Sequence, residues 1–150
     1  MKNILVVCMG NICRSPTMEA VLKQKALRAN LPLHIESAGT IGYHQGNPPD
    51  SRSRVAGEKR GYDFSAMTAR QVTLQDFTDF DLILCADKQN LRDLQAICPA
   101  HLQAKLKLFL SYGTLGKTEV PDPYYGGAQG FEQVLDLVEE AADGLIAALR

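Results

Sequence analysis

Residues 6–16 read Val6-Val7-Cys8-Met9-Gly10-Asn11-Ile12-Cys13-Arg14-Ser15-Pro16. The apolar run over residues 4–7 predicts a buried strand. Pro16 suits the first turn of a helix, where its missing N–H would have no partner, and Ser15 before it suits the N-cap. The sequence therefore predicts a short loop over residues 8–15, placed between a strand and the N-terminus of a helix.

The predicted loop has the composition of an anion-binding site. Gly10 and Asn11 tolerate the left-handed backbone that a tight loop needs. Backbone N–H groups and the positive end of the helix dipole would then point into one concavity. Arg14 adds a planar set of donors that can bind two phosphate oxygens at once. We therefore expect a phosphate-binding loop formed by Met9, Gly10, Asn11, Ile12, Cys13, Arg14 and Ser15.

Cys8 is expected at the base of this loop, where the strand ends. A helix N-terminus and a nearby arginine both favour the thiolate over the thiol, so Cys8 would need no histidine as a base. The alternative is an inert buried cysteine of a strand, as many cysteines are. The positions of Arg14 and Ser15 favour a nucleophile aimed at a bound oxyanion.

Two segments resemble a known family. Residues 8–15 resemble the Cys-x5-Arg-Ser signature loop of the low-molecular-weight protein-tyrosine phosphatases, and they lie near the N-terminus as in that family. The segment Asp122-Pro123-Tyr124-Tyr125 resembles the family's Asp-Pro-Tyr-Tyr segment near the C-terminus. The similarity extends over nearly all of the chain, including residues 36–39, 69–71, 81–87 and 90–94.

Strand and helix patterns alternate along the chain. Strands are predicted over residues 3–7, 33–37, 80–85 and 105–110, and helices over 16–29, 50–60, near 74–77, over 87–97, and from about Phe131 to Leu149. Asp50 or Ser51 is the predicted N-cap of the second helix, and Asp87 is the predicted N-cap of the fourth. The alternation predicts an α/β fold, a parallel sheet covered by helices on both faces. Ligands of such sheets bind beyond the carboxyl ends of the strands, where Cys8 falls. The family resemblance implies four strands in the order 2-1-3-4.

Composition limits the possible partners and location. The 150 residues are expected to form one domain, residues 1–150, and 16 basic against 17 acidic side chains favour neither nucleic acid nor an anionic membrane. The sequence shows no targeting segment and no membrane span, so we expect a cytoplasmic protein. Cys8, Cys13, Cys85 and Cys98 do not suggest a disulfide framework. Zinc spacing is absent as well, and neither a metal nor a cofactor is expected.

The resemblance implies roles for further residues. Asp122 would protonate the leaving phenolate and later deprotonate water, although an Asp-Pro pair taken alone would indicate a turn. Ser15 would donate a hydrogen bond to the sulfur of Cys8. Asn11 and Ser37 would hydrogen-bond to each other and hold the loop in shape.

The resemblance also implies a substrate cleft and a redox switch. The walls of the cleft would be formed by Ile12, Tyr43, Tyr124 and Tyr125. The alternative for Tyr43 and Tyr124 is an aromatic side chain on a surface loop. Cys13 would form a disulfide with Cys8 under peroxide. Some members carry a histidine before the Ala-Arg-Gln segment that supports the loop. This chain has Met67 there, so its loop must be supported by other residues.

The implied activity is hydrolysis of protein phosphotyrosine and small aryl phosphates through a phosphocysteine. Phosphotyrosine proteins would be the partners, with a bacterial tyrosine kinase among the candidates, and the chain would be a monomer or weak dimer. One alternative is a thioredoxin-coupled arsenate reductase, which needs two closely spaced further cysteines, whereas Cys85 and Cys98 lie far apart. Another is a non-catalytic phosphotyrosine-binding regulator, which would lack the thiol or the acid.

Overall fold

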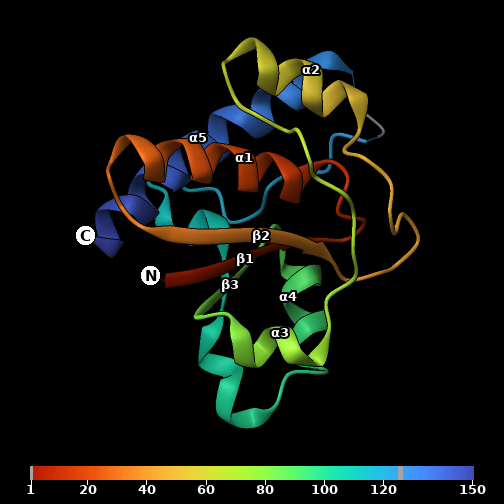
Figure 1. Ribbon diagram of the computed structural model, residues 1–150, viewed down its shortest axis with the longest axis vertical. Helices are drawn as coiled ribbons and strands as arrows, with labels where there is room; N and C mark the ends of the chain where they lie inside the picture. Colours follow the sequence, from red (N-terminus) through yellow and green to blue (C-terminus); the bar gives the residue numbers. More distant parts are fainter. Residues whose placement is uncertain (1, 125–126) are drawn as a thin grey trace.

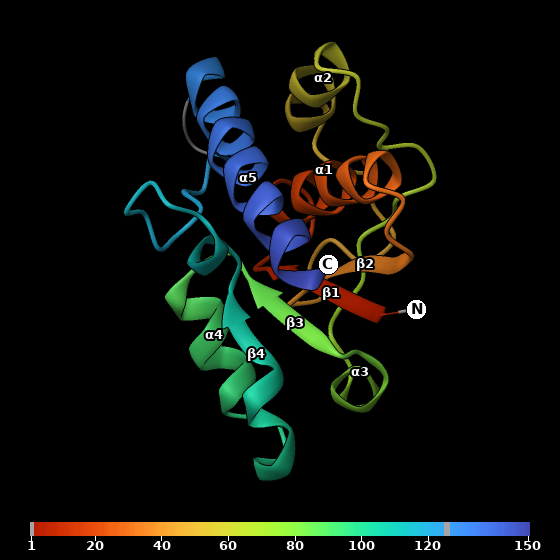
Figure 2. The ribbon, with the colours of Figure 1, turned by 90° about the vertical axis from the view of Figure 1, so that its left-hand side faces the viewer.

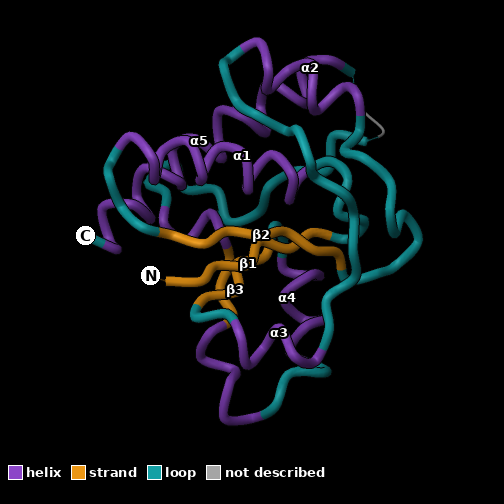
Figure 3. The backbone as a smooth tube through the Cα atoms, viewed as in Figure 1, coloured by secondary structure: helices purple, strands orange, loops and turns teal. Residues whose placement is uncertain are grey.

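The computed structural model describes residues 2–124 and 127–150. Its sheet, whose strands are orange in Figure 3, is parallel in each of its strand pairs. Within these residues the strand order is β2-β1-β3-β4, as predicted. The register places Cys8 beside Gly39 of β2, and Val7 beside Cys85 of β3. The strands are β1 (Lys2–Cys8), β2 (Leu33–Gly39), β3 (Leu82–Cys85) and β4 (Leu106–Leu108).

Helices cover both faces of the sheet (Figures 1 and 2). In Figure 1, α1, α2 and α5 lie above the strands, and α3 and α4 lie below them. No helix in the described ranges is long and apolar enough to cross a membrane. The helices are α1 (Arg14–Arg28), α2 (Ser51–Lys59), α3 (Leu74–Asp79), α4 (Lys88–Gln95) and α5 (Ala128–Leu149), with 3-10 turns η1 (Ala100–Lys105) and η2 (Phe109–Tyr112).

The central strand β1 divides its side chains between two cores. Alternate residues of a strand point to opposite faces, so a central strand of a covered sheet is apolar on both. Ile4, Val6 and Cys8 pack with residues of α1, α2 and α5. Leu5 and Val7 pack with residues of α3 and α4 on the other face. This alternation directs the side chain of Cys8 towards the face covered by α1.

The start of α1 differs from the prediction. The helix begins at Arg14, and its N-cap is Cys13, which makes no side-chain capping hydrogen bond. Ser15 is therefore not the N-cap but lies inside the first turn, together with Pro16. The hydroxyl of Ser15 instead lies near the sulfur of Cys8, at 3.1 Å, and accepts a hydrogen bond from Asn11 Nδ2 at 2.8 Å.

The last two strands are shorter than predicted. The apolar run that begins at Phe80 enters the sheet only at Leu82, and the run over residues 105–110 contributes only Leu106–Leu108. Phe109 and Leu110 are buried in the 3-10 turn that follows, so their hydrophobicity reflects packing and not strand pairing. Of the two candidate N-caps of α2, Asp50 and Ser51, the structure selects Asp50, and the predicted N-cap of α4, Asp87, is confirmed. Asp50 accepts from Arg52 N at 2.9 Å, and Asp87 accepts from Asn90 N at 2.8 Å.

Candidate active site

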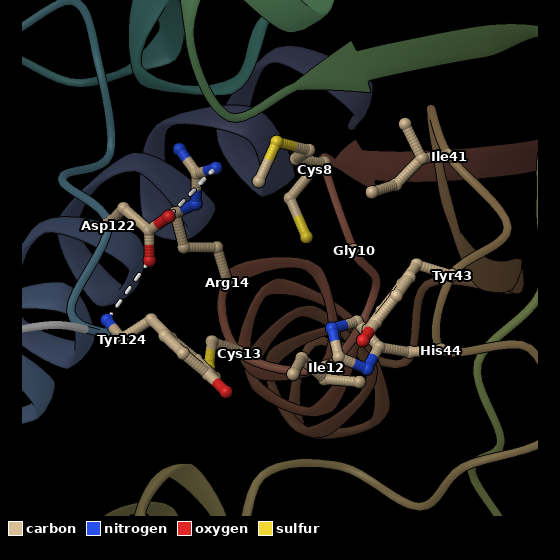
Figure 4. Close-up of a pocket in the computed structure, with 11 residues that line it drawn as sticks. Cys8, Gly10, Ile12, Cys13, Arg14, Ile41, Tyr43, His44, Asp122 and Tyr124 are labelled. Carbon is tan, nitrogen blue, oxygen red and sulfur yellow. Dashed lines mark hydrogen bonds and ion pairs between the residues drawn. The ribbon is translucent and has the colours of Figure 1, made fainter.

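A pocket of about 380 Å³ opens beyond the carboxyl end of β1 (Figure 4). Its floor comes from the loop between β1 and α1, one wall from the loop after β2, and the opposite wall from the segment before α5. The predicted residues brought together here include Cys8, Arg14, Asp122, Tyr43 and Tyr124. Tyr125 lies outside the described residues. The pocket is lined by Cys8, Met9, Gly10, Ile12, Cys13, Arg14, Ile41, Tyr43, His44, Asp122 and Tyr124.

Asn11 holds the loop in its unusual shape. Its backbone is left-handed, with φ of 58°, a conformation that asparagine adopts more readily than most residues. Its buried side-chain amide donates to Ser15 Oγ at 2.8 Å and to Ser37 Oγ at 3.0 Å. Its side-chain oxygen accepts from Arg70 N at 3.0 Å. These contacts support the loop in this chain, and Met67 packs against the apolar core instead.

The sulfur of Cys8 lies at the centre of this network. The backbone N–H of Asn11 donates to it at 3.3 Å, and Ser15 Oγ lies at 3.1 Å. The Ser15 hydroxyl already accepts from Asn11, and its next acceptor, Ala38 O, is farther away, at 3.5 Å. When Cys8 is a thiolate, its sulfur has no hydrogen to donate, and the serine hydroxyl is placed to donate to it. Two donors aimed at one buried sulfur stabilise a negative charge there.

Arg14 is buried beneath the pocket and held on one side. Its Nη1 donates to Asp87 Oδ2 at 2.6 Å and to Val120 O at 3.2 Å, while Nη2 lies 3.8 Å from Asp122 Oδ2. Burial alone would lower the pKa of Arg14, but Cys8 and Asp87 raise it overall, so the cation is retained. Sequence reasoning identified Asp87 only as a helix cap and missed its contact with Arg14.

Asp122 reaches the pocket from the segment that follows η2. Its Oδ1 accepts from Tyr124 N at 3.0 Å, and its side chain is 36% exposed, so the carboxyl is open to the pocket (Figure 4). Val120 N donates to Ala86 O at 2.7 Å and fixes the start of this segment against the sheet. A carboxyl group and a buried cation thus lie together opposite a thiol.

The wall formed by the loop after β2 contains two residues that sequence reasoning missed. His44 and Ile41 line the pocket beside the predicted Tyr43, whose ring meets the His44 ring edge-to-face at 4.9 Å. Gly10 makes the approach of His44 possible, because a Cβ on Gly10 would lie 2.9 Å from His44 Cδ2. The position of His44 next to Tyr43, in a loop rich in glycine and proline, was the available signal.

The other cysteines have different surroundings. Burial, and after it the charge of Asp50, raises the pKa of Cys13 to about 12, so Cys13 is a thiol at neutral pH. Cys85 and Cys98 pack in the core on the opposite face of the sheet, away from the pocket. Within residues 2–124 and 127–150, no three histidine, cysteine, aspartate or glutamate side chains gather as a metal site would require.

The fold and the pocket together are those of an α/β protein that gathers a thiol, a buried arginine and a carboxyl group beyond the carboxyl end of its central strand. Comparison with known proteins shows the family to which this arrangement belongs. The sequence profile of the family described as "Low molecular weight phosphotyrosine protein phosphatase" matches residues 3–150. The Streptomyces coelicolor low molecular weight protein-tyrosine-phosphatase is 41% identical over 153 residues, covering 98% of this chain and 93% of that protein. The human low molecular weight phosphotyrosine protein phosphatase is 42% identical over 137 residues, covering 89% of this chain and 86% of that protein.

Solved structures agree with the sequence relatives. The protein tyrosine phosphatase of Entamoeba histolytica, with Hepes in its active site, superposes with a TM-score of 0.96 at 42% identity, covering 99% of this chain and 97% of that one. Wzb of Vibrio vulnificus in complex with benzylphosphonate superposes with a TM-score of 0.88 at 30% identity, covering 98% of each chain. The chain therefore belongs to the low molecular weight phosphotyrosine protein phosphatase family and is a hydrolase of that class.

Proposed function

We propose that this chain hydrolyses protein phosphotyrosine and small aryl phosphates through a phosphocysteine on Cys8. The observation that carries the proposal is the sulfur of Cys8 at the base of an anion pocket. That sulfur has Asn11 N at 3.3 Å and Ser15 Oγ at 3.1 Å, with the buried Arg14 beside it. A thiolate held in this way is a nucleophile aimed at the phosphorus of a bound phosphate ester.

In the first step the thiolate of Cys8 attacks phosphorus. A P–S bond forms and the P–O bond to the phenol breaks, while the loop N–H groups and Arg14 stabilise the negative charge on the equatorial oxygens. Asp122, which faces this position across the pocket, transfers its proton to the departing phenolate oxygen. The products of this step are the free phenol and a phosphocysteine.

In the second step water attacks the phosphocysteine. Asp122, now a carboxylate, accepts a proton from the water, and the S–P bond breaks to release inorganic phosphate and the Cys8 thiolate. The hydroxyl of Ser15 stabilises the departing thiolate through its hydrogen bond to Sγ. The same carboxyl group thus acts first as an acid and then as a base.

The walls of the pocket support an aryl phosphate as substrate. Tyr43 is 84% exposed and Tyr124 is 39% exposed, so both rings can contact the ring of a bound phosphotyrosine. Ile12 adds an apolar surface on the floor. The benzylphosphonate in the Vibrio vulnificus structure has the same combination of an aromatic ring and a tetrahedral anion. The proposed partners are phosphotyrosine proteins met in the cytoplasm, such as a bacterial tyrosine kinase, bound by a monomer or weak dimer.

Cys8→Ser tests the proposal directly. The variant should lose turnover of p-nitrophenyl phosphate, because a serine hydroxyl in this loop remains protonated, but it should still bind inorganic phosphate. Cys98→Ser, on the opposite face of the sheet, is the matched control and should retain full activity. The wild-type protein, quenched during turnover, should carry one phosphate on Cys8 by mass spectrometry. Substantial turnover by Cys8→Ser, or reduction of arsenate coupled to thioredoxin, would overturn the assignment.

A further inference from the structure

Arg52, in the first turn of α2, is held rigidly by Asp50. Its Nε lies 3.1 Å from Asp50 Oδ1 and its Nη2 lies 3.0 Å from Asp50 Oδ2, so two parallel hydrogen bonds fix the plane of the guanidinium. The N–H of Arg52 also donates to Asp50 Oδ1 at 2.9 Å. The guanidinium therefore has a defined place, although the Arg52 side chain is 46% exposed.

The fixed guanidinium contacts the wall of the pocket that carries Asp122. Its central carbon lies 5.3 Å from the centroid of the Tyr124 ring and 4.9 Å from that of Phe131 in α5. Both distances are within the range of a cation–π contact. The backbone N–H of Tyr124 in turn donates to Asp122 Oδ1 at 3.0 Å. Arg52 is thus linked to Asp122 through a single residue.

The other end of this link reaches the phosphate-binding loop. Asp50 N donates to Ile12 O at 2.7 Å, so the residue that fixes Arg52 is itself bonded to the loop. Asp122 also contacts the loop directly across the pocket, because its Oδ2 lies 3.8 Å from Arg14 Nη2. The start of the Asp122 segment is anchored to the sheet through Val120, and Arg52 contacts its other end.

We propose that Arg52 is a positioning residue that holds the Tyr124 segment, so that the Asp122 carboxyl faces the leaving-group oxygen above the loop. The proposal rests on the proposed role of Asp122 as the general acid. Arg52 would neither bind phosphate nor contact the reacting atoms. Its loss should impair proton transfer to the leaving group and leave attack by Cys8 intact, because a misplaced acid loses most of its effect.

The experiment compares Arg52→Gln with Arg54→Gln on two substrates. Arg54 is a matched control, because it lies two residues further along α2, its side chain is 47% exposed, and it pairs only loosely with Glu58 at 3.7 Å. For Arg52→Gln we expect kcat/KM to fall roughly 10- to 100-fold on phenyl phosphate, and much less on p-nitrophenyl phosphate, whose leaving group needs little protonation. Arg54→Gln should match the wild type on both substrates, and Arg52→Lys should restore part of the loss.

Asp122→Asn provides the second arm and separates the two proposals. If Asp122 is the acid, Asp122→Asn alone gives the same substrate-dependent loss, and adding Arg52→Gln to it causes little further loss, because both act on one step. If Asp122→Asn does not change the substrate dependence, the proposed function fails whatever Arg52→Gln does. If Asp122→Asn behaves as expected but the two losses multiply, the role proposed for Arg52 is wrong.

Two further measurements guard against a purely structural effect. The inhibition constant of inorganic phosphate and the Tm should be nearly equal in Arg52→Gln and Arg54→Gln. A common loss on both substrates, together with weaker phosphate inhibition, would mean that Arg52 supports the phosphate-binding loop and would overturn the proposal. If Arg52→Gln lowers the Tm, Arg52→Lys decides the question, and a substrate-dependent loss that Arg52→Lys does not relieve at all would count against it.

Discussion

The hydroxyl oxygen of Ser15 lies 3.1 Å from the sulfur of Cys8, and both side chains are buried. The same oxygen accepts a hydrogen bond from Asn11 Nδ2, so the Ser15 hydroxyl is placed to donate its own hydrogen to the sulfur of a Cys8 thiolate. In the proposed reaction the sulfur is the leaving group of the second step. The relationship therefore predicts which step depends on Ser15.

Ser15→Ala should slow the breakdown of the phosphocysteine. A hydrogen bond to a charged group contributes about 1.5–3 kcal/mol, so kcat should fall roughly 10- to 100-fold. The loss in kcat/KM should be smaller, and the phosphocysteine should accumulate as a larger burst of phenol in rapid-quench measurements. Ser37→Ala, which removes a contact to Asn11 but none to Cys8, is the comparison and should have the smaller effect. Equal losses in both variants would contradict a specific role for Ser15.

Asp122→Asn should lower turnover by roughly 10²–10⁴-fold, as expected for the loss of one positioned proton donor. Turnover of phosphotyrosine should fall more than turnover of an activated aryl phosphate, because the phenolate of tyrosine needs a proton as the P–O bond breaks. If the variant loses turnover equally on both substrates, the acid is a different residue, and Asp50, Asp87 and Asp93 are the next to test.

The raised pKa of Cys13 makes the proposed redox switch dependent on pH. Burial, and then the charge of Asp50, holds the Cys13 thiol protonated up to a pKa of about 12. Peroxide would oxidise the Cys8 thiolate to a sulfenic acid, which the Cys13 thiolate then attacks, releasing the oxygen as water. The fraction of Cys13 present as thiolate rises with pH. Disulfide formation should therefore become about tenfold faster for each unit by which the pH rises, as long as the pH stays below the pKa of Cys13.

Peptide mapping after peroxide treatment at several pH values measures this disulfide. Dithiothreitol should restore the activity of the wild type, whereas Cys13→Ser, the control, should proceed to irreversible oxidation of Cys8. Inactivated protein with Cys13 free at every pH would refute the switch.

Asp76 should make the stability of the fold depend on acid pH. Burial alone would raise the pKa of Asp76, but Arg70, whose Nη1 and Nη2 donate to it at 2.9 and 3.1 Å, lowers it overall. A carboxyl whose pKa is lower in the folded state stabilises the fold above its unfolded pKa of about 3.9. That stabilisation is lost as the pH falls through the folded pKa.

Urea unfolding of the wild type and Asp76→Asn at a series of pH values checks this sign. The wild type should be the more stable above about pH 4, and the difference should shrink as the pH falls below the unfolded pKa of about 3.9. Asp79→Asn, an exposed position in the same helix, is the control and should show little difference. If the difference in the free energy of unfolding between wild type and Asp76→Asn stays constant down to pH 2, the ionisation of Asp76 does not contribute to stability as expected.

The parallel sheet and the loop between β1 and α1 could be predicted from local patterns, whereas the strand order was implied only by the family resemblance. The alternation of strand and helix indicates a parallel sheet, and Gly10, Asn11 and Arg14 each have a residue-specific reason to occupy their positions. The confirmed caps at Asp50 and Asp87 are local in the same sense.

Contacts between segments that are distant in the sequence could not be predicted from local patterns. The pairing of Arg14 with Asp87 joins residues 73 positions apart, and the approach of His44 to Gly10 depends on how the loop after β2 folds back. The end of β4 was missed because burial in a 3-10 turn and burial in a strand leave the same apolar pattern at Phe109 and Leu110. The assignment of Ser15 as a cap was wrong because its hydroxyl faces the sulfur of Cys8.

The anchoring of Arg14 affects the entropy of anion binding. One of its terminal nitrogens is held by Asp87 and Val120, so the long side chain has already lost its rotational freedom when the protein folds. Free arginine side chains lose about 2 kcal/mol of rotamer entropy when they are ordered. In the proposed reaction that loss precedes the arrival of phosphate, and the remaining donors would meet the anion without rearrangement. We therefore expect Asp87 to contribute to anion affinity without contacting the anion, by keeping the guanidinium preorganised.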